Sequence, residues 1–366
     1  MAAHAQPVLS RRALNRATLD RQFLLRRQSL PAVDAVRHLV GLQAQNTKPP
    51  YYALAARIEG FRPEELSSLM ESRAVARLVT MRSTIHTHTA DDCLALRPLM
   101  QAGGPERELK GFRKGLVGVD LDRLTALSRE SVEEAPRSVK ELRTLLLAEW
   151  PDADPLALTV AARILLPLVQ VTPRGLWGRS GQVELTTAEQ WFGRPVADPP
   201  PAPDETVRRY LAAFGPASVK DFQTWSGLTR TRPVFERLRP ELLAFRDEDG
   251  TELFDLPDAP RPDPDAPAPP RFLPEFDNLL LSHADRSRVV PPEYRSRTWT
   301  GNQAHRTFLV DGFLAGIWRM EDDGGRTEIV VEPFRPLSAA GRDALEAEAA
   351  HTLGVLVPDP HVRFAT

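Results

Sequence analysis

The sequence predicts an α+β protein in which helices followed by a β-hairpin occur three times in tandem and a strand-rich domain comes last. Three observations support this fold class. Helical spacing of apolar residues gives way to strand-like alternation three times along the chain. The segments Ser138-Val-Lys-Glu-Leu and Ser218-Val-Lys-Asp-Phe hold the same place in the second and third units, and each serine is a good helix N-cap. Proline-rich segments separate the later parts.

Helices followed by a hairpin are the outline of a winged helix. We therefore expect three tandem winged-helix motifs, at residues 1–118, 119–198 and 204–257, followed by a β-barrel-like domain at 271–366.

The first unit starts with a helix over Arg11–Arg27, for which Ser10 is the expected N-cap. A second helix begins near Ala32 and stops before the two prolines at 49–50, because proline cannot continue a helix. Short helices over 51–60 and 63–73 follow. Two alternating strands, 77–82 and 84–89, then form the hairpin.

The second and third units repeat this order. In the second we expect helices Leu121–Glu134, Ser138–Glu149 and Leu156–Leu166, and strands Leu168–Thr172 and Gln182–Leu185. In the third we expect helices Val207–Phe214, Ser218–Ser226 and Arg232–Arg239, and strands Leu242–Arg246 and Glu252–Leu256 across an Asp-Gly turn.

The C-terminal domain follows a linker, residues 257–270, in which seven of fourteen positions are proline, a composition that predicts an extended chain that resists packing against the protein. Strands are expected at Asn278–Ser282, Phe308–Val310, Phe313–Trp318 and Thr327–Val331, with turns at 311–312 and 324–325. A helix over Ala339–Leu353 closes the predicted barrel or sandwich.

The composition is that of an ordinary globular protein, with 42% hydrophobic and 26% charged residues. No apolar run reaches the roughly 18 residues that span a bilayer, and no secretory signal begins the chain. The single cysteine, Cys93, excludes a disulfide framework and a cysteine zinc site, which favours the cytoplasm. Because nucleotide, dinucleotide and zinc motifs are absent, we expect no cofactor, no nucleotide and no metal.

Positive charge is concentrated near the N-terminus. Residues 1–60 carry nine Arg or Lys and three Asp or Glu, a net charge of +6, so the rest of the chain carries −8 of the total of −2. Such a face either binds nucleic-acid phosphates or is a solvated basic helix.

Gln43-Ala44-Gln45 is the most unusual short motif. In a continuous helix, residues two apart point in nearly opposite directions, but if the chain leaves the helix after Gly41 both amides lie on one side. Two such amides can hold a water molecule between them. The alternative is a polar helix end that bonds its own backbone.

Basic and polar groups on the hairpin form a second candidate site. His86 and His88 alternate on a strand and so face the same way, with Arg82 and Thr84 beside them. We expect these four residues to contact DNA; a solvated strand face and a metal site are the alternatives, and no third ligand is evident.

Arginines also cluster near residue 286. Arg286 and Arg288 suit DNA phosphates, or else pair with Asp285, Asp277 and Glu275. A further basic cluster, Arg107, Lys110, Arg113 and Lys114, looks like a mobile loop.

Four blocks of the chain resemble bacterial winged-helix DNA glycosylases of the AlkZ and YcaQ type. The blocks are LSRRALNR from Leu9, VGLQAQN from Val40, MRSTIHTHTADD from Met81 and LPEFDNLLLSHADRSRV from Leu273. The Gln-Ala-Gln motif matches the Gln-apolar-Gln pattern of the AlkZ-like branch, where the other branch has Asp in the last position. Together the blocks extend over nearly the whole chain.

The resemblance implies a monofunctional DNA glycosylase that hydrolyses the N-glycosidic bond of N7-alkylated purines, including bulky natural-product adducts and interstrand crosslinks. Carried over by position, Gln43 and Gln45 are the catalytic pair that holds the attacking water, and the partner is duplex DNA bound by a monomer. No lysine lies within the motif, Lys48 being the nearest, so a lyase step is not expected. Because a crosslinked base cannot be fully extruded, we expect an open cleft around Gln45 instead of a closed pocket.

Two other functions remain open from the sequence. A winged-helix transcriptional regulator would bind DNA without releasing a base, and a metallohydrolase would use His86 and His88.

Overall fold

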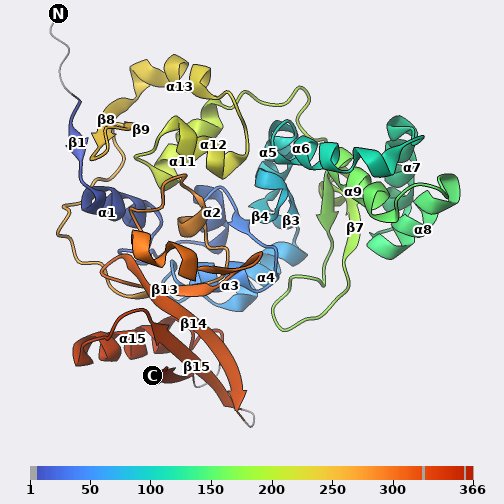
Figure 1. Ribbon diagram of the computed structural model, residues 1–366. Coiled ribbons are helices and arrows are strands. Elements are labelled where there is room, and N and C mark those ends of the chain that lie inside the picture. Colours follow the sequence, from blue (N-terminus) through green and yellow to red (C-terminus); the bar gives the residue numbers. More distant parts are fainter. Residues whose placement is uncertain (1–5, 324–325, 358–359, 366) are drawn as a thin grey trace, which may run out of the picture.

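A computed structural model describes residues 6–323, 326–357 and 360–365. The predicted turn at 324–325 lies outside the described residues. Within the described part of the chain, no helix is both long and apolar enough to cross a membrane. The fold is mixed α/β (Figure 1).

The first unit contains both the predicted helices and the predicted hairpin. Ser10 caps its first helix by accepting a hydrogen bond from the Ala13 amide at 3.1 Å. That helix ends at Arg21 and not at Arg27, because Phe23 adopts a left-handed backbone conformation with φ 58°. The elements are β1 (Val8–Leu9), α1 (Arg11–Arg21), α2 (Ala32–His38), β2 (Leu42–Gln43), α3 (Pro49–Ala55), α4 (Pro63–Glu71), β3 (Val75–Val79), η1 (Met81–Ser83), β4 (Ile85–Thr89), α5 (Ala90–Met100), α6 (Gly104–Gly111) and η2 (Arg113–Leu116).

The second and third units also follow the predicted order of helices and hairpin. Ser138 and Ser218 both cap helices through reciprocal bonds with an acidic residue three positions on, as their shared motif predicted. The second unit consists of α7 (Leu121–Glu134), β5 (Arg137–Ser138), α8 (Val139–Glu149), α9 (Pro155–Leu165), β6 (Leu168–Gln170), β7 (Glu184–Thr187) and α10 (Ala188–Phe192). The third consists of α11 (Asp204–Phe214), α12 (Val219–Ser226), α13 (Arg232–Leu238), η3 (Arg239–Glu241), β8 (Leu243–Asp247) and β9 (Glu252–Asp255).

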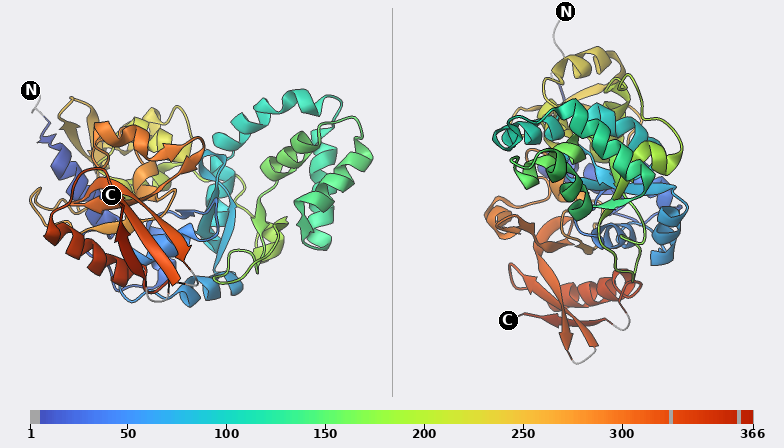
Figure 2. Two further views of the ribbon diagram at one scale, coloured as in Figure 1. Left: turned by 60° about the horizontal axis from the view of Figure 1, so that its bottom comes forward. Right: turned by 90° about the vertical axis from the view of Figure 1, so that its right-hand side faces the viewer.

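Two sheets join parts of the chain that the sequence analysis treated separately. The first two hairpins share one six-stranded sheet of order β2-β4-β3-β6-β7-β5, in which β3 pairs antiparallel with β6. The third hairpin accepts the first strand of the chain, because β1 pairs parallel with β8. Figures 1 and 2 show α7, α8 and α9 as a lobe on one side of the molecule, with the first and third units and the C-terminal domain on the other side.

The C-terminal domain contains an open sheet in place of the expected barrel. Its order is β10-β13-β14-β15-β16, and within the described residues the two edge strands do not pair with each other. α15 packs on this sheet, and the same hydrophobic core includes residues from α2, α3 and α4. The elements are β10 (Arg271–Leu273), α14 (Asn278–Leu281), η4 (Pro292–Arg297), β11 (Trp299–Thr300), β12 (Gln303–Ala304), β13 (Arg306–Val310), β14 (Phe313–Asp323), β15 (Arg326–Pro333), α15 (Ala339–Thr352) and β16 (His361–Phe364).

Two sequence predictions in this region need correction. The expected strand at Asn278–Ser282 is the short helix α14, whose N-cap Asp277 accepts a hydrogen bond from the Leu279 amide at 2.9 Å. The proline-rich linker does not run free of the protein, because arginines of α1 bind its carbonyl groups. Arg16 donates to the Ala266 carbonyl at 2.7 Å, and Arg21 donates to the Pro260 carbonyl at 3.0 Å.

Candidate active site

The Gln-Ala-Gln motif forms the short edge strand β2 and its continuation. The chain leaves α2 through Val40 and Gly41, both with positive φ, and then runs extended beside β4. Gln43 lies opposite His86 in this pairing, and the Ala44 amide donates to the Ile85 carbonyl at 2.7 Å. The condition for two amides on one side, an exit from the helix at Gly41, is therefore met. Gln43 is buried, with 7% of its surface exposed, whereas Gln45 is exposed.

Three contacts fix the backbone of this motif. Asn278 of α14 donates to the Gly41 carbonyl at 2.7 Å, and Arg77 of β3 donates to the Ala44 carbonyl at 2.7 Å. Gly41 has φ +91°, and a Cβ there would lie 2.3 Å from Nδ1 of His88. The close approach of the motif to β4 thus requires glycine at this position.

Hydrogen bonds also fix the direction of both amide groups. The Gln43 Oε1 atom accepts from the Arg82 guanidinium at 2.8 Å, and the Gln45 Oε1 atom accepts from the Ile85 amide at 3.3 Å. Guanidinium and backbone N–H groups only donate, so in each glutamine the oxygen must occupy the bonded position. Within the described residues neither Nε2 group has a protein partner. Each glutamine therefore has a free N–H donor and one remaining lone pair on its oxygen.

Arg82 connects the hairpin turn to the third unit. Its guanidinium also donates to the Trp225 carbonyl at the end of α12. The backbone of the turn packs against Gly104 and Gly227, where a Cβ would lie 2.5 Å from Ser83 N and 3.2 Å from Arg82 N, respectively. Burial, and then the charge of Arg286, lower the pKa of Arg82 to about 10, so the side chain stays cationic at neutral pH. The turn is held between two other segments and does not project freely, and the Thr84 hydroxyl bonds within it to the Met81 carbonyl at 3.1 Å.

The two hairpin histidines face the protein interior. His86 and His88 are 1% and 0% exposed, and the Thr80 hydroxyl bonds to both rings, at 3.2 Å and 2.9 Å. Burial lowers the pKa of His86 well below its usual value and that of His88 to about 4, so both rings are neutral at neutral pH. The expected contact of these histidines with DNA is not supported, because both side chains are buried. Nε2 of His86 lies 3.4 Å from the Arg82 guanidinium. The ring therefore contacts the same side chain that donates to Gln43.

The two arginines predicted to bind DNA phosphates, Arg286 and Arg288, lie in different environments. Arg288 is buried and donates to the Pro216 carbonyl at 2.8 Å and the Thr18 hydroxyl at 3.2 Å. It therefore joins α1 to the third unit and is not free to bind phosphate. Arg286 is partly exposed, its side chain makes no hydrogen bond or ion pair with the described residues, and it lies near enough to Arg82 to lower the pKa of that residue.

The carboxylates near these arginines serve the framework of the site. Asp277 forms a fully buried ion pair with Arg57, at 2.7 Å, and Glu275 pairs with Arg306 at 2.8 Å. In the described part of the chain, no three or more His, Cys, Asp or Glu side chains are grouped as metal ligands.

Sequence reasoning missed two residues that hold the motif, Arg77 and Asn278. A signal for Arg77 existed, since a cation at position three of the otherwise apolar strand Val-Ala-Arg-Leu-Val needs a specific partner. No comparable signal marked Asn278, because its role depends on α14 meeting the end of α2.

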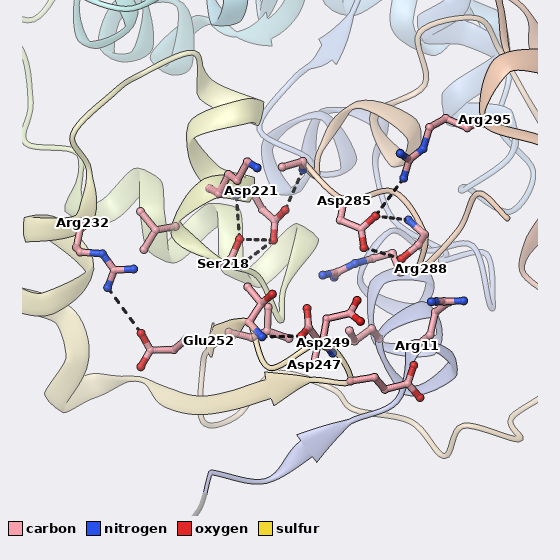
Figure 3. Close-up of a pocket in the computed structure, with 18 residues that line it drawn as sticks. Arg11, Ser218, Asp221, Arg232, Asp247, Asp249, Glu252, Asp285, Arg288 and Arg295 are labelled. Carbon is pink, nitrogen blue, oxygen red and sulfur yellow. Dashed lines mark hydrogen bonds and ion pairs between the residues drawn. The ribbon is translucent and has the colours of Figure 1, made fainter. Parts of the chain in front are cut away.

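Five well-formed cavities are found among the described residues, and Arg82, which bonds to Gln43, lines one of them. Figure 3 shows one between the start of α12, the β8–β9 turn and residues 284–288, with a volume near 480 Å³. Neither Gln43 nor Gln45 lines this cavity or four others in the described residues. The open cleft expected around Gln45 stays a prediction.

Comparisons with known proteins identify relatives of this chain. The family model described as "DNA glycosylase AlkZ-like" matches residues 36–354. An interstrand DNA cross-link repair glycosylase of Streptomyces sahachiroi is 26% identical over 352 residues, which cover 91% of this chain and 93% of the relative. The structure of Streptomyces sahachiroi DNA glycosylase AlkZ superposes with a TM-score of 0.81 at 23% identity, over 98% of this chain and all of that one. At that identity the structural likeness establishes the fold.

Proposed function

Because the chain belongs to the AlkZ-like family of DNA glycosylases, we propose that it hydrolyses the N-glycosidic bond of N7-alkylated purines in duplex DNA. Bulky adducts and interstrand crosslinks are included, since a relative over nearly the full length is named for cross-link repair. The observation that carries this proposal is the pair of glutamines whose amide oxygens are both hydrogen-bonded, with Gln43 buried and Gln45 exposed.

The substrate explains why amides are sufficient. An N7-alkylated guanine is cationic and leaves as a neutral base, so protonation by a general acid is not required. As the bond breaks, the deoxyribose becomes an oxocarbenium-like cation that reacts with a weakly activated water. The enzyme then has to place that water below C1′, a task of orientation.

The two glutamines divide this task. The free Nε2 group of Gln43 donates to one lone pair of the water, while Gln45 Oε1 uses its remaining lone pair to accept a hydrogen bond from one water O–H. The water keeps a second lone pair for attack on C1′. Once the new C1′–O bond has formed, the proton of that O–H passes to bulk water, because a neutral amide is too weak a base to keep it. Arg82 prevents the Gln43 amide from turning over and, as a cation, strengthens its N–H as a donor.

We also propose how the three units are built and how the protein binds its DNA partner. The three helix-and-hairpin units are winged helices, and the protein binds the duplex as a monomer in the cytoplasm. No lysine lies beside the two glutamines in sequence, and Lys48 is exposed three residues beyond Gln45. The reaction therefore stops at the abasic site.

The test is base release from duplexes that contain one N7-methylguanine, one bulky N7 adduct or one N7-linked interstrand crosslink. The wild type should produce abasic sites in all three, and Gln43→Ala and Gln45→Ala should each slow release by about 10²- to 10⁴-fold at saturating protein. Sequence-specific binding without base release would contradict the proposal and indicate a regulator. Activity that chelators abolish would indicate the metallohydrolase.

A further inference from the structure

The third unit has two helices with exposed faces, α12 and α13. In a helix-turn-helix arrangement the second helix enters the DNA groove, which here would be α13. The charges on the two helices indicate instead that α12 faces the DNA.

The arginines of α13 and of the adjoining η3 are bound to carboxylates of the same unit. Arg237 pairs with Asp204 at 2.7 Å, and Arg232 pairs with Glu236 at 3.2 Å. Arg239 bonds to Glu236 at 2.7 Å and to Glu252 at 3.0 Å. A cation already paired with a carboxylate offers little net charge to a phosphate, so α13 presents a nearly neutral face.

The β8–β9 turn beside α13 is acidic. Asp247, Glu248 and Asp249 follow one another there, and Figure 3 shows Asp247 and Asp249 facing the cavity that this turn helps to line. The turn corresponds to the wing of the third unit. Three consecutive carboxylates repel a DNA backbone, so the turn itself is unsuited to the duplex. Lys220 lies between the two faces, because it lines both this cavity and the groove described below.

The exposed face of α12 has the opposite character. Lys220, Gln223, Thr224 and Gly227 stand at positions i, i+3, i+4 and i+7 and form one stripe along the helix. The stripe carries no carboxylate, and Lys220 makes no ion pair with the described residues. The one acidic neighbour within the helix, Asp221, is turned inward to Ser218 and the Ala284 amide.

A groove lies between this stripe and α6. It has a volume of about 720 Å³ and is lined from α6 by Gly104, Arg107 and Glu108. Glu108 is already neutralised by Arg163, at 2.5 Å, and it also accepts a hydrogen bond from Ser83. Arg107 is exposed, and the only hydrogen bond of its side chain to the described residues is a 3.5 Å bond to the Gly227 carbonyl. Two cations, Arg107 and Lys220, thus line the groove without a carboxylate partner.

The groove adjoins the candidate active site. Arg82 lines it, and the same guanidinium donates to Gln43 and to the Trp225 carbonyl at the end of α12. A DNA strand in this groove would therefore pass one side chain away from Gln43.

We propose that the groove between α12 and α6 binds a backbone phosphate of the DNA through Lys220 and Arg107, and that α12, not α13, is the helix of the third unit that faces the duplex. The inference rests on the proposed function for the identity of the nucleic acid. It adds the path of the strand and assigns α13 and the acidic turn to the framework.

The test compares three exposed cations by the salt dependence of DNA binding. Fluorescence anisotropy with a short duplex is recorded for the wild type and three variants, Lys220→Ala, Arg107→Ala and the matched control Arg237→Ala. Each variant removes one positive charge. Losing a phosphate contact lowers the slope of log K against log salt by about 0.9 and weakens binding several-fold. We expect this for Lys220→Ala and Arg107→Ala, and an unchanged slope for Arg237→Ala.

The outcomes separate this inference from the proposed function. Wild-type base release from N7-methylguanine DNA is measured in the same buffer. Release together with unchanged slopes, or with an equal loss in Arg237→Ala, would overturn the groove assignment alone. The expected slopes without base release would overturn the proposed function and leave the groove assignment standing, and an absence of salt-dependent binding by the wild type would overturn both.

Discussion

The oxygens of the two glutamines accept hydrogen bonds from different donors, Arg82 for Gln43 and the Ile85 amide for Gln45. This difference predicts that substitution by glutamate has unequal effects at the two positions. Gln45→Glu keeps an acceptor for the water proton, so we expect base release within about tenfold of the wild type. Gln43→Glu loses the N–H donor and pairs with Arg82, so we expect a loss of about 10²- to 10⁴-fold. Single-turnover rates at saturating protein measure both.

Each variant adds one negative charge, so any general weakening of DNA binding should be similar in both. At saturating protein concentration, weaker binding no longer affects the measured rate of base release. Circular dichroism melting checks that both remain folded. An equal loss of rate in the two variants, or a larger loss in Gln45→Glu, would disprove this division of roles.

At the scale of single residues, the sequence identified most residues of the candidate site. It did not predict whether their side chains face the solvent or the protein interior. The motif and Arg82 were identified, and the structure brings Arg82 onto Gln43. Alternation correctly indicated that His86 and His88 share a direction, but periodicity cannot tell which face of a strand is covered. That depends on the elements that pack on the sheet, such as α2 and α5, which both contact β4.

At the scale of elements, the placement of β2 depends on a glycine. Gly41 and Gly60 both have positive φ, yet a Cβ on Gly41 would lie 2.3 Å from the His88 ring, and one on Gly60 would meet nothing within 4 Å. Gly60→Ala should cost only the left-handed backbone strain, about 1 kcal/mol of the free energy of unfolding. Gly41→Ala should cost about 3 kcal/mol or more and slow base release, because the clash displaces β2.

Urea denaturation of both alanine variants, with base-release rates beside it, measures this difference. Gly60→Ala is the matched control for left-handed strain. If the two variants lose equal stability, the contact with His88 does not hold β2 in place.

The elements that sequence patterns mispredicted are short and depend on packing. Asn278–Ser282 contains three leucines, which read equally well as a strand or a buried helix. The structure has a single helical turn there because Asp277 caps it and Asn278 binds the end of α2. The basic cluster at 107–114 was expected to be a mobile loop, yet it forms α6 and η2, with Arg163 of α9 bound to Glu108.

At the scale of the whole molecule, the predicted units do not pack as separate bodies. β3 pairs with β6 across the first two units, and α2 to α4 share a core with the C-terminal sheet. Local patterns indicate each unit, but pairings between strands more than 80 residues apart, such as Leu78 with Val169, leave no local signal. The order of elements was therefore predictable, and their assembly around the two glutamines was not.

This shared packing buries three imidazoles in their neutral form, which predicts an acid-sensitive fold. Burial lowers the pKa of His88 to about 4 and that of His283 to about 3, and it lowers the pKa of His86 well below 6.5. As the pH falls through about 6.5, the unfolded chain binds protons at these histidines and the folded protein does not. Stability is therefore complete above that pH and is lost progressively below it, until the folded-state pKa values are reached.

The free energy of unfolding should fall by about 1 kcal/mol per imidazole between pH 7.5 and 5.5, or about 3 kcal/mol from these three rings. His38 adds to the loss in the same direction, because burial lowers its pKa as well. Urea denaturation at these two pH values measures this loss. The paired carboxylates contribute little in this window because nearby arginines keep the pKa values of groups such as Asp92 and Asp311 low. His88→Gln, whose amide does not titrate, should reduce the loss by about 1 kcal/mol. Equal stability at pH 7.5 and 5.5 would show that these rings are not held neutral by the fold.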